Sequence, residues 1–289
     1  MKLPKGFLHR AAVTSLLPQY SQSELMNNRF FEAAHVEDQE VDRAVNIKGV
    51  RKEADAAEIA ADNLEYFARN KVTMEADFVG NLAEQITKEK ADLFCNTISQ
   101  FWSDGYQVRN GTPMQQLLAS VRDYLLSFLD TPKPFVQQDA KLTEPANFSI
   151  FDIQAILDLN KEMLYQYLHE WMRGHPNYLE LTLGDLYCRR GLYLDSLIDA
   201  GNEYTEYAYI NSYSLATSVP EKFAQIKETD YPSIIHTRYE RIRERILFFG
   251  PFIPDMPDNQ LEFGVIPGNN PQTILYDGKH AGMYEYRID

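Results

Sequence analysis

Cysteine, long apolar runs and positive charge are scarce in this sequence. Its two cysteines, Cys95 and Cys188, lie far apart, each within an apolar pattern. They predict buried free thiols, which suit a reducing compartment, and they disfavour a cysteine-based zinc site. No run approaches the roughly 18 apolar residues that a membrane span requires. The N-terminal residues lack the apolar core of a signal peptide, so we expect a cytoplasmic protein without a membrane span.

Positive charge is outweighed by negative charge, with 28 Lys and Arg against 42 Asp and Glu and a formal net charge of -14. A surface of this sign repels phosphate backbones, so general nucleic-acid binding is disfavoured. A basic protein partner fits the charge better. Solubility alone is the alternative explanation of the acidity.

Sequence motifs typical of catalytic, phosphate-binding or metal-binding sites are also missing. The glycines near the C-terminal end lack the strand, loop and helix context of a phosphate-binding loop. Glu32 and His35 copy half of the motif of di-iron bundles, but the second half is absent. His236, beside Tyr239 and Glu240, could belong to a site, yet no nucleophile signature accompanies it. We therefore predict no catalytic residue, metal or cofactor, and the sequence favours a non-enzymatic protein.

What the sequence has in abundance is helical periodicity. Ser149 and Asp152 form a capping box at the start of an apolar stripe that predicts a helix over 150–173. A turn with Gly174 and Pro176 follows, and apolar residues at helical spacing then predict a second helix over 178–216. Two helices joined by a short turn lie antiparallel. The expected fold is therefore mainly α, a helical bundle built around this long pair.

The remaining segments complete this prediction. A helical pattern over about 51–102 should break near Asn70 or Gly80, and the proline-containing stretch 131–147 is a possible internal linker. Beyond Gly250, prolines and glycines forbid helix, and short strands are expected at 261–266, 273–276 and 283–288. Asp277 and Gly278 suit a hairpin turn. We expect a helical domain over 1–250 and an extended C-terminal arm over 251–289.

The candidate partner-binding residues share two features, high charge or phenol content and a place on one predicted helix face. Carboxylates and tyrosines gather along the predicted helix 178–216, where they would form a docking strip for a basic partner and a partly wet subunit interface. A row of arginines follows at helical spacing and would pair with carboxylates or hold an anion. The candidates are Asp185, Asp195, Asp199, Glu203, Glu206, Tyr207, Tyr213, Arg238, Arg241 and Arg245.

Three classes of function remain open. The first is a non-enzymatic interaction or assembly protein, such as an adaptor or a structural subunit, with virion or injection-machine components as architectural analogies. This class predicts a homo-oligomer or a subunit of a complex, assembled from a cytoplasmic pool, and the sequence favours it. The second is a cytosolic acidic inhibitor or immunity-type protein that neutralises a basic partner. The third is a helical enzyme with a pocket that no motif marks.

Overall fold

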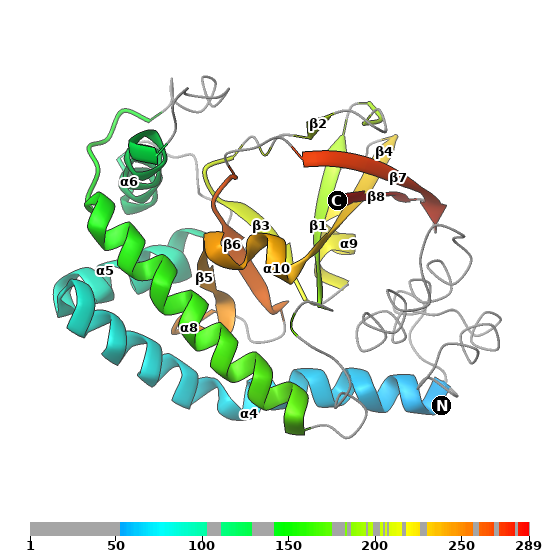
Figure 1. Cartoon of the computed structure of the whole chain (residues 1–289), viewed down its shortest axis with the longest axis horizontal. Helices are drawn as coiled ribbons and strands as arrows, with labels where there is room; N and C mark the ends of the chain where they lie inside the picture. The colour runs from blue at the N-terminus through cyan, green and yellow to red at the C-terminus, as the bar shows by residue number, and fades with distance from the viewer. Residues whose placement is uncertain are drawn as a thin grey trace.

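A computed structural model describes most of the chain, and Figure 1 shows helices on one side and strands on the other. The described residues are 53–102, 111–128, 142–174, 183, 186–194, 196–198, 203–204, 206, 208–215, 218–225, 230–256, 260–268, 272–280 and 283–288. The helices before the sheet are α4 (Glu53–Ile86), α5 (Lys88–Thr97) with the π-helical turn η3 (Ile98–Trp102), α6 (Pro113–Phe128) and α8 (Ile150–Gly174).

The remaining elements form and cover a sheet. Its strands are β1 (Tyr187–Leu194), β2 (Glu203–Tyr204), β3 (Asn211–Ser214), β4 (Tyr231–Arg238), β5 (Ile246–Phe249), β6 (Glu262–Val265), β7 (Gln272–His280) and β8 (Met283–Ile288). Between them lie α9 (Ser218–Ala224), α10 (Tyr239–Ile242) and the 3-10 turns η6 (Arg243–Arg245) and η7 (Gly250–Phe252).

The sheet is mixed, with the order β2-β7-β8-β4-β1-β3-β6-β5. Only the pair β4 and β8 is parallel among the described strands; the other pairs are antiparallel. The predicted mainly-α helical bundle is therefore wrong, because the described part combines helices with a large mixed sheet.

The helix α8 has the start that its sequence predicts. The backbone N–H of Ser149 donates to Asp152 Oδ2 at 2.7 Å, and the backbone N–H of Asp152 donates to Ser149 Oγ at 3.1 Å. This reciprocal pair satisfies donors that a helix start leaves without partners. Burial opposes ionisation of Asp152, but hydrogen bonds from Lys90 and Ser149 outweigh it and lower the pKa of this carboxyl. The cap thus also ties α8 to α5.

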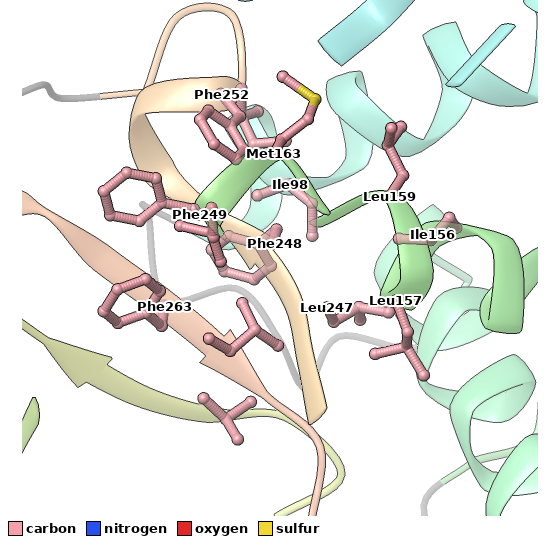
Figure 2. Packing of buried hydrophobic residues seen from close by; sticks show 14 of the residues in the cluster. Ile98, Ile156, Leu157, Leu159, Met163, Leu247, Phe248, Phe249, Phe252 and Phe263 are labelled. Atoms are coloured by element: carbon pink, nitrogen blue, oxygen red, sulfur yellow. The ribbon is translucent and has the colours of Figure 1, made fainter. Parts of the chain in front are cut away.

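The main core lies where α8 and α4 meet β5 and β6, and Figure 2 shows its phenylalanines from close by. The rings of Phe249 and Phe263 stack with centroids 4.8 Å apart, and Phe67 of α4 meets Phe249 edge to face at 5.7 Å. Asn160 of α8 is fully buried and donates to the carbonyl of Leu247 at 2.7 Å. Apolar burial and this one polar contact fix the helices to the β5 edge of the sheet.

The predicted second helix, 178–216, is wrong in its described part, which forms β1, β2 and β3. The apolar spacing is compatible with helix, but Gly184, Gly191 and Gly201 interrupt it, and tyrosines enrich it in strand-forming side chains. From Tyr187 to Gly191 the strand is buried on both faces, except for the partly exposed Arg190. A strand buried on both faces has no alternation of apolar and polar residues, which removed the usual strand signal.

Other local predictions are corrected as follows. The arginine row does not lie on one helix: Arg238 ends β4, Arg241 lies in α10 and Arg245 ends η6. The break in the helical region falls at Thr87, whose φ is 91°, and not near Asn70 or Gly80.

The C-terminal strands are present as β6, β7 and β8, but β8 lies inside the sheet between β7 and β4. They therefore pair within the same chain, and residues on both sides of Gly250 share one sheet. Asp277 and Gly278 lie within β7 at a register shift, so the predicted hairpin turn at these residues is also wrong.

Candidate functional site

The ten candidate residues have different environments in the structure. Arg238 and Arg241 are exposed, while Glu206, Tyr213 and Arg245 come together in one network. Five candidates cannot be placed as side chains: Asp185, Asp195, Asp199 and Tyr207 lie outside the described residues, and Glu203 is described only as backbone in β2. The half motif of Glu32 and His35 and residues 131–141 of the possible linker also lie outside the described part.

The network around Glu206 is buried, so it is not the exposed strip that the sequence predicts. Glu206 is only 6 % exposed. Its Oε1 accepts from the Tyr213 hydroxyl at 2.8 Å, and its Oε2 accepts from Arg245 Nη1 at 2.7 Å and from the Gly268 backbone N–H at 3.2 Å. Arg245 Nη1 also donates to the carbonyl of Ile266 at 2.7 Å. These contacts tie β3 to the end of η6 and to the loop after β6.

Arg190 of β1 also belongs to this network, and no sequence pattern singled it out. Its guanidinium lies 5.9 Å above the centre of the Tyr213 ring, and its Nη1 donates to the Tyr204 hydroxyl at 3.3 Å. Burial alone would lower the pKa of Arg190, but Tyr204, Tyr213 and Glu206 outweigh that effect and raise it. Burial raises the pKa of Tyr213 well above its usual value. Both side chains therefore keep their protons.

The other face of the sheet carries a second group of ionisable side chains, centred on His236. His236 Nε2 lies 2.9 Å from Glu285 Oε2, and the two side chains are 1 % and 0 % exposed. They come from the adjacent parallel strands β4 and β8. Such a carboxylate fixes the orientation of the imidazole ring.

Strand register brings further charges to His236. Arg189 of β1 is its directly paired residue on one side, and Arg287 of β8 is its paired residue on the other. Asp277 of β7 lies at the register shift between Tyr276 and Gly278, directly before the residue that pairs with Glu285. All three are buried, with exposed fractions of 0 %, 9 % and 1 %. We call Arg189, His236, Glu285, Arg287 and Asp277 the sheet cluster.

The short helix α9 lies over the same face as the sheet cluster. An added Cβ at Gly191, two residues from Arg189, would meet the backbone carbonyl oxygen of Pro220 at 2.0 Å. Ala224 of α9 also packs with Ile234 and Met283 in a small apolar cluster. Glu221 of α9 is buried as well, and it is the carboxylate that this helix adds beside β1. The apolar anchor of α9 is therefore small beside the main core.

Burial of the ionisable side chains of the sheet cluster is energetically unfavourable. Moving an ion from water into the protein interior costs several kcal/mol even after relaxation, and apolar side chains of similar volume often give equal or greater stability. Groups of buried, interacting titratable residues are therefore enriched at functional sites. The sequence showed part of this pattern, because Glu285 and Arg287 alternate within an otherwise strand-like run. The sequence drew attention to Tyr239 and Glu240 beside His236, whereas the structure places Glu285 of β8 within 2.9 Å of its ring.

No family model matches the chain, and neither a curated protein nor a solved structure matches it significantly. Among the described residues, no group of three or more His, Cys, Asp or Glu is placed to hold a metal ion. No helix in the described ranges is long and apolar enough to cross a membrane.

Proposed function

We propose that the protein is an enzyme that uses His236 as its acid–base residue and Glu285 as the residue that orients it. The observation that supports this is the 2.9 Å contact between His236 Nε2 and Glu285 Oε2 within a buried group of charges. Histidine is the side chain best suited to exchange protons near neutral pH. A carboxylate on one ring nitrogen stabilises the imidazolium that forms when the other nitrogen accepts a proton.

In this proposal the reaction is a hydrolysis: His236 accepts a proton from a water molecule whose oxygen attacks the substrate, the bond to the leaving group breaks, and the imidazolium returns the proton to the leaving group. Arg189 and Arg287, paired with His236 on either side, would stabilise negative charge that develops on the substrate. Because His236 and Glu285 are buried, the substrate reaches them only when a covering element moves. The helix α9 is the described element that covers this face, and its apolar anchor involves Ala224, Ile234 and Met283.

The test is turnover of a panel of esters, phosphoesters and glycosides by the full chain. His236→Asn should lower the rate by roughly 100-fold to 10,000-fold, the usual contribution of general acid–base catalysis. Glu285→Gln should lower it less and shift the pH profile. Exposed Arg173, in the last turn of α8, provides a control, because Arg173→Gln should leave the rate unchanged. Equal turnover by the wild type and by folded His236→Asn would refute the proposal.

An assembly or adaptor role is a second candidate, supported by one exposed apolar surface. Tyr193 and Phe223 are 39 % and 46 % exposed, and their rings lie 6.0 Å apart. Exposed aromatic pairs are enriched at protein interfaces. Light scattering tests this role: a homo-oligomer that Phe223→Ser converts to a monomer supports it, and a monomeric wild type that captures no partner contradicts it.

A further inference from the structure

Arg190 differs from the other charged groups around Glu206, because no described carboxylate forms an ion pair with it. Within the described part of the chain, the Glu206 oxygens accept from Tyr213, Arg245 and Gly268. Arg190 instead contacts the Tyr204 hydroxyl and the Tyr213 ring. A guanidinium has five N–H donors, so these neutral contacts use only part of its capacity.

The position of Arg190 is also fixed. Arg190 lies on β1, which pairs with β4 on one side and with β3 on the other. The electron-rich face of Tyr213 and the Tyr204 hydroxyl restrain its side chain further. Such an arginine loses little conformational entropy when it binds a ligand, so more of the interaction energy contributes to affinity.

Among the described side chains of this network positive charge exceeds negative charge, although the chain as a whole is acidic. Arg190 and Arg245 contribute two positive charges and Glu206 contributes one negative charge, which leaves one net positive charge among these three residues. The formal net charge of the chain is -14. The Arg190 residue is partly exposed, in contrast to the fully buried Arg189 beside it.

We propose that Arg190 and the Tyr204 hydroxyl bind a phosphate group, carried by a phosphate monoester or present as free phosphate, on the face of the sheet opposite His236. A guanidinium donates two parallel hydrogen bonds to a pair of phosphate oxygens, and a doubly charged phosphate gains more from the positive charge than a carboxylate does. This site is independent of the proposed enzyme activity, because Arg190 and its neighbour Arg189 point to opposite faces of β1.

The test is a calorimetric titration of the full chain with inorganic phosphate at mildly alkaline pH, with ionic strength held constant by chloride. The wild type should show one saturable site. Arg190→Gln should weaken the affinity at least about tenfold, and Arg190→Lys should weaken it less because it keeps the charge but loses the paired donors. Line broadening of the phosphorus-31 signal provides a second readout.

Arg122→Gln is the matched control, because it removes the same charge from α6, where Arg122 pairs with Asp123 at 3.0 Å. This variant should bind phosphate within about twofold of the wild type. Thermal unfolding verifies that each variant is folded. If Arg190→Gln does not fold, the affinity of Arg190→Lys is compared with that of the wild type instead. The proposal is overturned if the wild type shows no saturable phosphate binding, if Arg122→Gln weakens binding as much as the Arg190 variants, or if acetate displaces phosphate at equal concentration.

Discussion

Replacing Gly191 with alanine should displace α9 from the face of the sheet that carries the sheet cluster. An alanine Cβ at this position would lie 2.0 Å from the carbonyl oxygen of Pro220 and 3.0 Å from the backbone nitrogen of Ala224. Both atoms belong to the backbone of α9, so no side-chain rotation relieves the overlap. The helix must move away from β1, which separates Ala224 from its contacts with Ile234 and Met283.

The size of the effect follows from two opposing contributions. Forcing an extra methyl group into a packed site costs about 1–3 kcal/mol, and the rigid backbone contact places Gly191→Ala near the upper value. Alanine also lowers the conformational entropy of the unfolded chain, which offsets about 0.4–1 kcal/mol of this cost. We expect a net loss of about 2 kcal/mol in the free energy of unfolding, which lowers the melting temperature by roughly 3 °C for a chain of this size.

The assay is differential scanning calorimetry combined with hydrogen exchange of the β1 and β4 amides. Gly80→Ala is the control, because an added Cβ at Gly80 in α4 meets nothing within 4 Å. In a helix interior that change should stabilise the protein by roughly 0.5–1 kcal/mol. The reasoning is refuted if Gly191→Ala is as stable as Gly80→Ala, or if exchange at β1 and β4 is unchanged.

Three further predictions concern the described core. Asn160→Ala should lower the free energy of unfolding by about 1–3 kcal/mol, since it removes the 2.7 Å contact that satisfies the Leu247 carbonyl; urea denaturation measures this. Burial raises the pKa of Glu262, so its ionised form destabilises the fold and stability is lost as pH rises through that pKa. Glu262→Gln accepts the same bond from Trp102 without ionising and should be more stable than the wild type at about pH 8 but not at about pH 4, as followed by thermal unfolding; an equal difference at both pH values contradicts this. Burial raises the pKa of the Cys95 thiol to about 12, so a thiol reagent should modify it only after denaturation, and rapid native-state labelling would count against the assigned burial.

Local helix signals could be interpreted from the sequence because they depend on near neighbours. The capping box at Ser149 and Asp152 and the apolar stripe after it specify α8 within a few residues, without knowledge of the rest of the fold. The strand β1 could not be identified in this way, because its partners β3 and β4, which pair with its two edges, come later in the chain. The apolar residues of that segment fall at helical spacing because they are numerous, and the spacing does not reflect a helix.

The candidate site was predictable only in fragments for the same reason. Glu206, Tyr213 and Arg245 were chosen for their charge or phenol groups, but their mutual contacts depend on sheet pairing across long separations. His236 was noticed, whereas its partner Glu285 lies 49 residues further along the chain. Only the pairing of β4 with β8 brings them together, and no short-range pattern encodes a parallel pair.

The most direct test of the central claim, that the sheet cluster is retained for chemistry at a cost in stability, is the free energy of unfolding of the double variant His236→Asn/Glu285→Gln. Both changes keep hydrogen-bonding side chains of similar volume and remove the ionisable pair. We predict a double variant at least as stable as the wild type, because burial of the two ionisable groups is no longer required. A loss of more than about 3 kcal/mol would contradict the claim and assign the pair a structural role.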